Sequence, residues 1–180
     1  NDTYEKINKD LKYLERPKIL IQNIIAHVKK PIDHIILMST YDPTGIINLD
    51  NVGNIFLKGN RYDPLYLVAI LNSRIISWYA YHFIYGNAIR TMRFDTYHLQ
   101  KLPFRHINFN DKKDFERYTA LINLVNTILS ITQSEDYLDN KDKQEEVRKI
   151  QDEIDKLVYK LYGLTEEEIE VVEKSISGGV

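Results

Sequence analysis

A chain of 180 residues that is 43% hydrophobic and 28% charged has the balance of a globular protein with its own core, which excludes a disordered chain. The sequence contains no cysteine, which excludes a disulfide framework and a thiolate metal site. It has neither an apolar run near the ~20 residues that span a bilayer nor a signal-peptide pattern. We therefore expect a cytoplasmic protein with no membrane partner. Because the sequence starts at Asn1 and not at methionine, we also expect a fragment of a longer chain.

The net charge is −2, but the charged residues are distributed unevenly along the chain. Residues 1–110 contain 14 Lys and Arg against 9 Asp and Glu, together with all 5 histidines. Residues 111–180 contain 10 Lys and Arg against 17 Asp and Glu. A basic half suits a polyanionic partner, which the acidic half would repel, although surface charge is also uneven in proteins without such a partner.

Short apolar segments separated by turns predict strands in the first half of the chain. Residues 18–25, 34–41 and 52–58 are rich in branched apolar residues, as strands are. Turn chemistry at Lys30-Pro31, at residues 42–45 and at residues 58–60 separates them.

A helix is predicted from Asp63-Pro64, an N-cap followed by a first-turn proline, to about Phe83. Its apolar stripe is wide enough to predict burial against a sheet; it includes Leu67, Leu71, Ile75 and Trp78. Gly86 is expected to end this helix. A loop over residues 86–96 and an extended stretch over residues 98–104 should follow.

The second half has the spacing of two heptad helices. The first apolar seam is Phe115, Tyr118, Ile122, Val125, Leu129 and Thr132, and the second is Val147, Ile150, Ile154, Leu157 and Leu161. The polar residues 133–142 between the seams predict an antiparallel helical hairpin. Gly163 should end the second helix, and the capping box of Thr165 and Glu168 should begin a short third helix. The expected fold is α+β: a small mixed sheet with a buried helix, then an antiparallel helical hairpin and a short C-terminal helix.

The segments that resemble catalytic motifs have structural explanations in this sequence. Asp63-Pro64-Leu65-Tyr66 resembles the Asp/Asn-Pro-Pro-Tyr loop with which amino-methyltransferases hold a flipped base, but the third residue is Leu and capping explains the first two. No glycine-rich cofactor loop follows a strand. The acidic clusters at residues 145–146 and 166–168 lie on predicted helix faces, and the scattered histidines lack metal-ligand spacing. We therefore expect no catalytic residue and no metal ligand.

The segment over residues 85–94 is the strongest binding candidate. It places Asn87, Arg90, Thr91 and Arg93 in a loop that begins with glycine. Arginine can pair bidentately with guanine, asparagine can do so with adenine, and either can hold a phosphate. An ordinary surface loop is the alternative. The candidates for phosphate contacts are Arg61, Lys29, Lys30 and Lys101.

Several stretches in this order resemble the TaqI-like C-terminal specificity domain. They are RPKILI at 16–21, LYLVAILNSR at 65–74, residues 86–93 and YHLQKLPF at 97–104, and residues 154–170 resemble the helical tail of many such chains. The resemblance implies the target-recognition part of a type IIG or type I restriction–modification enzyme. It implies recognition of double-stranded DNA, with S-adenosylmethionine and magnesium bound in other domains and no cofactor in this fragment.

The resemblance also implies a partner, the methyltransferase or nuclease domain of the same or a neighbouring chain. Residues 1–109 would be the target-recognition domain and residues 110–180 a helical spacer and docking region. The family's base-reading residues vary among members, so the choice of residues 87–93 here depends on their chemistry alone. Two alternatives stay open: a protein-interaction module that acts through the heptad helices, and an enzyme fragment with a degenerate methyltransferase site around Asp63.

Overall fold

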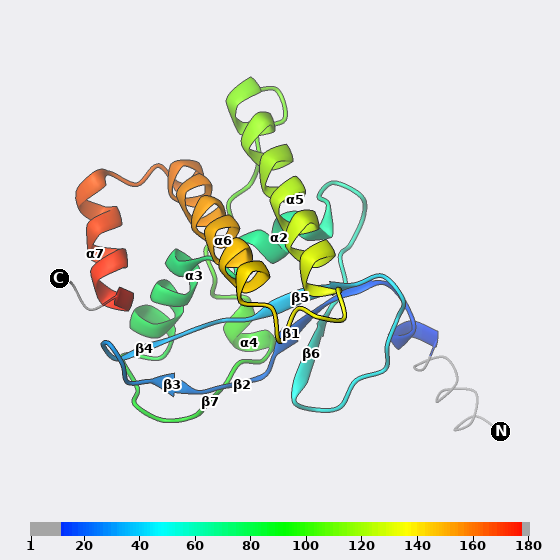
Figure 1. The fold of residues 1–180 in the computed structure, drawn as a ribbon, viewed down its shortest axis with the longest axis horizontal. Coiled ribbons are helices and arrows are strands. Elements are labelled where there is room, and N and C mark those ends of the chain that lie inside the picture. The colour runs from blue at the N-terminus through cyan, green and yellow to red at the C-terminus, as the bar shows by residue number, and fades with distance from the viewer. Residues whose placement is uncertain (1–11, 178–180) are drawn as a thin grey trace.

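The strands of the chain form three small antiparallel sheets (Figure 1) in a computed structural model that describes residues 12–177. The central strand β1 (Lys18–Gln22) pairs with β5 (Ser39–Asp42) on one side and with β6 (Val52–Ile55) on the other. Strand β2 (Ile24–Ile25) pairs with β7 (Met92–Arg93), and β3 (His27–Val28) pairs with β4 (His34–Ile35). The α+β class is confirmed, but the expected single mixed sheet is replaced by these antiparallel pairs.

Two predicted strands are each divided by a polar interaction. The segment 18–25 changes partners at Asn23, whose backbone N–H donates to Asn51 O over 2.9 Å and whose carbonyl accepts from Phe94 N over 2.7 Å. The segment 34–41 is interrupted at Leu37, whose N–H donates to the hydroxyl of Ser77 instead of to a strand. The third segment ends as a strand at Ile55, so all three predicted strands are shorter than expected.

The helix predicted over residues 64–83 is wrong as a continuous helix. Helix α2 (Pro64–Leu71) and helix α3 (Arg74–Tyr79) are separate, and a π-helical turn, η1 (Ala80–Ile84), follows. The amide of Asn72 accepts from Ser39 N over 2.6 Å and donates to Ser39 O over 2.9 Å, while the Ser73 hydroxyl donates to Ile70 O. Such side chains compete with the helical backbone for hydrogen bonds, so the helix ends there.

The extended stretch predicted over residues 98–104 is also wrong, because it begins inside a short helix, α4 (Thr96–Leu99). Asp95 caps this helix by accepting from Tyr97 N and His98 N, and His98 completes a capping box. Aspartate at an N-cap favours a helix over a strand.

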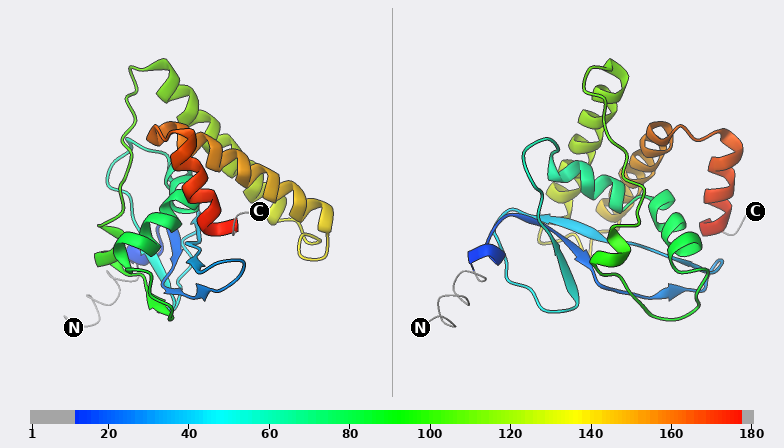
Figure 2. Two further views of the ribbon diagram at one scale, coloured as in Figure 1. Left: turned by 90° about the vertical axis from the view of Figure 1, so that its left-hand side faces the viewer. Right: turned by 180° about the vertical axis from the view of Figure 1, so that it is seen from behind.

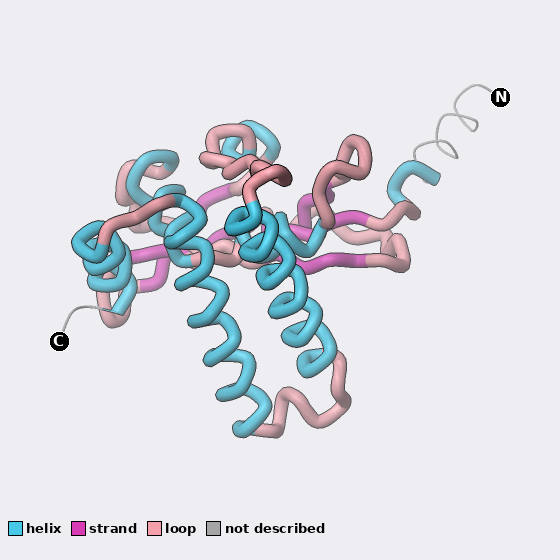
Figure 3. The backbone as a smooth tube through the Cα atoms, turned by 90° about the horizontal axis from the view of Figure 1, so that it is seen from above, coloured by secondary structure: helices cyan, strands magenta, loops and turns pink. Residues whose placement is uncertain are grey.

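The helical second half agrees with prediction in its elements. Helices α5 (Lys112–Thr132) and α6 (Lys141–Tyr162) form the hairpin, and α7 (Glu166–Ser177) is the short C-terminal helix. Gly163 ends α6 with φ of 73°, and Thr165 and Glu168 form the reciprocal pair of a capping box. Figure 3 shows the far end of the hairpin projecting away from the rest of the chain.

The buried stripes of the hairpin overlap the predicted seams only in part. Val125, Ile154 and Leu161 of the seams are buried, but Leu121 and Val158 outside them are buried too. Phe115 of the first seam is 49% exposed. Helix α5 packs against α2 as well as against α6, so its buried side turns toward both helices instead of following a two-helix seam.

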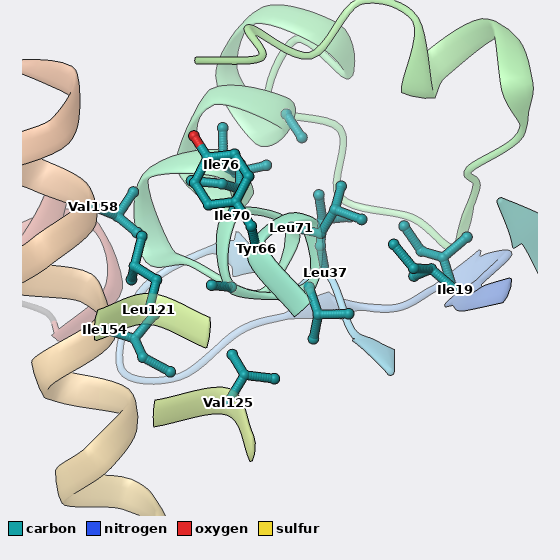
Figure 4. Close-up of a cluster of buried hydrophobic side chains, with 14 of the residues drawn as sticks. Ile19, Leu37, Tyr66, Ile70, Leu71, Ile76, Leu121, Val125, Ile154 and Val158 are labelled. Carbon is teal, nitrogen blue, oxygen red and sulfur yellow. The ribbon is translucent and has the colours of Figure 1, made fainter. Parts of the chain in front are cut away.

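One hydrophobic core joins the two halves (Figure 4): Ile19 of β1 and Tyr66 of α2 belong to the same cluster as Leu121 of α5 and Val158 of α6. The core therefore extends across residue 109, and the division into regions 1–109 and 110–180 stays a prediction. The long helices lie on one side of the strands, which leaves strands and loops along the opposite border of the molecule (Figures 1 and 2).

Candidate nucleic-acid interface

The loop after η1 begins with two residues in the left-handed region. Gly86 has φ of 58° and Asn87 has φ of 61°, a conformation that glycine adopts freely and asparagine more readily than most residues. Asn87 N donates to Tyr81 O over 3.0 Å, and Ala88 N donates to Tyr85 O over 3.2 Å. The chain therefore reverses direction here, which confirms that the helical segment ends at Gly86.

The two arginines of this loop are presented differently. Arg93 lies in β7 opposite Ile24, between Met92 and Phe94, which are 5% and 1% exposed. Because side chains alternate along a strand, these two anchors direct Arg93 outward. Its guanidinium lies 3.3 Å from a carboxylate oxygen of Asp50 in an exposed ion pair. Arg90 is exposed and forms no hydrogen bond or ion pair within residues 12–177. Asn87 and Thr91 are exposed as well.

Tyr85 fixes the backbone that carries Arg93. Its hydroxyl donates to Arg93 O over 3.0 Å, and its ring stacks on His98 at 5.2 Å between centroids. Burial, reinforced by the charge of Asp95, raises the pKa of Tyr85 above its ordinary value. The hydroxyl therefore stays protonated and keeps its proton for this hydrogen bond at neutral pH.

The loop over residues 42–51 is attached through Asn23 to the backbone next to Arg93. The Asn23 amide donates to Asp50 O over 3.1 Å, and the Asn23 backbone bonds to Asn51 and Phe94 as described above. With the Arg93–Asp50 pair, these bonds join residues 42–51 to residues 86–93, which together we call the loop edge. Sequence reasoning missed Asn23 and Asp50. The one available signal was the amide that interrupts the apolar run 18–25.

The base of the 42–51 loop is rigid. The carboxylate of Asp42 accepts from the backbone N–H groups of Thr44 and Ile46 and forms a buried pair with Lys18 Nζ at 3.1 Å. Burial acts to raise the pKa of Asp42, but the hydrogen bonds from Thr44, Lys18 and Ile46 outweigh it and lower this pKa to about 2. Gly45 has φ of 80°, and a Cβ there would lie 2.2 Å from Glu15 O, so only glycine fits.

The residues predicted to hold phosphates are dispersed. Lys29 and Lys30 lie in the β3–β4 turn, at the same end of the molecule as residues 86–91 (Figures 1 and 2). The ammonium of Lys101 lies 3.9 Å from the ring centroid of Tyr97, after α4. Arg61 lies in the segment between β6 and α2, which approaches α5 on the helical side, away from the loop edge. All eight sequence candidates stay predictions, and the structure groups only some of them.

The Asp63-Pro64-Leu65-Tyr66 motif has a structural role. Asp63 Oδ1 accepts from Leu65 N over 2.8 Å, which is the capping bond expected from the sequence. The Tyr66 ring is fully buried, and its hydroxyl donates to Arg105 O over 2.6 Å. Burial raises the pKa of Tyr66. An aromatic ring enclosed in the core cannot stack on a flipped base.

Two further properties concern residues 12–177 as a whole. Within them, no three His, Asp or Glu side chains lie together in a group that could hold a metal ion. None of the helices in this part of the chain is long and apolar enough to cross a membrane.

Residues 2–104 match the TaqI-like C-terminal specificity domain family. The match covers more than half of the chain and includes the loop edge, so the chain belongs to this family, and the resemblance seen in the sequence is confirmed. Membership supports a role in DNA sequence recognition within restriction–modification systems. Among curated proteins, no sequence matches the chain.

Proposed function

We propose that the chain binds double-stranded DNA sequence-specifically through its loop edge, as the non-catalytic specificity domain of a restriction–modification methyltransferase or endonuclease. One observation carries this proposal: in a specificity-domain chain, the loop edge presents Arg90 and Arg93 on a border that the long helices leave uncovered. The buried side chains on either side of Arg93, together with Tyr85 and Asn23, hold the backbone at Arg93 and Asp50, so DNA binding would have to order little backbone there.

The two arginines would have different tasks. Arg90 has no partner in the described part of the chain, so it can pair with guanine O6 and N7 without first breaking a contact. Arg93 must leave or share Asp50, which suits a contact made only when DNA replaces that carboxylate. Lys29 and Lys30, exposed in the β3–β4 turn, would hold phosphates at one end of the site.

The catalytic parts would reside in a partner. We expect the methyltransferase or nuclease domain, of the same or a neighbouring chain, to bind S-adenosylmethionine and magnesium and to act on a target adenine or cytosine. Calorimetry with S-adenosylmethionine and this chain alone should therefore give no binding heat at micromolar concentrations.

A second candidate function is a protein-interaction module that acts through the hairpin. Its supporting observation is apolar exposure on the helices and their connection: Leu138 is 82% exposed and Phe115 is 49% exposed. The two functions are compatible if the hairpin docks the catalytic partner while the loop edge binds DNA.

Binding of labelled duplexes at several salt concentrations tests the proposal. If Arg90 reads a base, Arg90→Ala should cost ~1–3 kcal/mol and relax the preference at one position of the selected site. If Arg93 holds a phosphate, Arg93→Ala should weaken all duplexes equally and reduce the salt slope by about one. Arg148→Ala, on the exposed face of α6, is the control and should change neither. Failure of the wild-type chain to prefer any duplex would refute the proposed function. If neither loop variant alters binding, residues 86–93 are not the base-reading segment, and residues 42–45 of the loop edge together with residues 58–63 outside it become the candidate surface.

A further inference from the structure

The loop edge also carries large apolar side chains that point into solvent. In the 42–51 loop, Ile46, Ile47 and Leu49 are 59%, 52% and 86% exposed. Exposed leucines are common singly, but three such side chains within four residues form a local apolar surface. This surface adjoins Asp50, the partner of Arg93, so it lies within the proposed DNA-binding edge.

The backbone around Leu49 is held in place, which distinguishes it from a mobile loop tip. Leu49 O accepts from Val52 N over 3.1 Å and from the Asn48 amide over 3.3 Å, and the Asn48 amide also donates to Val52 O over 2.5 Å. The next residue, Asp50, is held at its carbonyl by Asn23 and at its carboxylate by Arg93. The backbone that carries the exposed side chain of Leu49 is therefore held in place, next to the Asp50–Arg93 pair.

Among the base pairs, only those with thymine present a methyl group in the major groove, at C5 of the thymine ring. An apolar side chain gains from contact with that methyl group and gains nothing from the hydrogen-bonding edges. Arg90 and Arg93 supply the positive charge that draws the same edge toward DNA. We propose that Leu49 reads thymine by contact with its methyl group, and that it is a specificity-determining residue of this chain. This inference rests on the proposed function and adds to it the base that the 42–51 loop would select.

Thymine and uracil duplexes test the inference, because uracil differs from thymine only by the missing methyl group. A random duplex library is first enriched on the wild-type chain, and the selected sequence is then made with uracil in place of each thymine in turn. We expect at least one thymine whose replacement weakens binding about fourfold, the effect of losing one buried methyl-sized group.

Three variants test whether the lower affinity for uracil depends on Leu49. Leu49→Ala should bring the thymine-to-uracil affinity ratio at that position close to one, whereas Leu49→Met, which stays apolar, should retain it. The matched control is Leu138→Ala, since Leu138 is 82% exposed but lies in the α5–α6 connection; it should leave the ratio unchanged. Melting temperatures of all variants should equal that of the wild type because both leucines are solvent-exposed.

Three results would overturn the inference while leaving DNA recognition intact: a selected sequence without thymine, equal affinity for thymine and uracil, or an unchanged ratio in Leu49→Ala. The last result would assign Leu49 to a contact other than the methyl group. If no sequence is enriched at all, the proposed function itself fails, so the two failures are distinguishable.

Discussion

Asp155 gives the chain a defined response of stability to pH. This residue of α6 is 1% exposed, and its Oδ1 accepts from the backbone N–H of Arg74 over 2.7 Å. Its Oδ2 lies 3.5 Å from Arg74 Nε but has no hydrogen-bond donor within the described residues. The same guanidinium also pairs with Asp152 and Glu173, which ties α3 to α6 and α7. The buried carboxylate is thus only partly compensated.

Burial raises the pKa of Asp155 from 3.8 to about 6, although the Arg74 backbone hydrogen bond and charge oppose the rise. A carboxyl group whose pKa is higher in the folded state stabilises the fold below its unfolded pKa, and this contribution is lost as the pH rises through about 6. The difference between the two pKa values corresponds to about 3 kcal/mol. Asp155→Asn keeps an acceptor for Arg74 N–H and removes the titration.

Urea unfolding of wild type and Asp155→Asn between pH 4 and pH 7.5 measures this contribution. The stability of the variant relative to wild type should rise with pH by up to ~3 kcal/mol, with most of the change between pH 4 and pH 7. Glu145→Gln is a control of opposite sign, since Arg148 lowers the pKa of Glu145: its relative stability should fall as the pH rises through the ordinary range of a glutamate. A flat or falling difference for Asp155→Asn would refute the reasoning.

Three further predictions concern packing and the backbone. Val158→Asp, in the core, should cost about 4 kcal/mol of unfolding free energy, and Leu157→Asp, at a partly buried position, should cost clearly less; equal losses in urea would contradict the observed stripe. Gly45→Ala should cost about 3 kcal/mol because its Cβ meets Glu15 O, whereas Gly163→Ala, with open space around it, should cost about 1 kcal/mol. Glu146→Ala, on the exposed face of α6, should change the free energy of unfolding by less than ~0.5 kcal/mol, as measured by thermal melting.

Local chemistry was readable from the sequence because its partners are close in the chain. The cap at Asp63, the stop at Gly163 and the capping box of Thr165 and Glu168 each involve groups within a few residues of one another. The apolar periodicity likewise predicted the helical hairpin. Such features depend on the segment alone, so the sequence of that segment suffices.

The missed features depend on partners that are distant in the chain. The break after α2 depends on Ser39, 33 residues from Asn72, and the pairing of β2 with β7 joins Ile24 to Arg93. No local propensity reports these contacts. The loop edge was missed for the same reason: the 86–93 half had recognisable arginines, but its attachment to Asp50 through Asn23 is a tertiary contact.

In the proposed function, the residues of the loop edge that would contact DNA are different from those that hold the fold. Its anchors are Met92, Phe94 and Asn23, which are buried or hydrogen-bonded on the inner side. Its outward residues, Leu49 and Arg90, contribute almost nothing to the core, so substituting them should cost less than ~0.5 kcal/mol of stability. A specificity domain must change the sequence it recognises without losing its structure. Exposed side chains on a hydrogen-bonded frame would permit that change, since under the proposed function a new outward residue would alter the contacts with DNA while the frame stays the same.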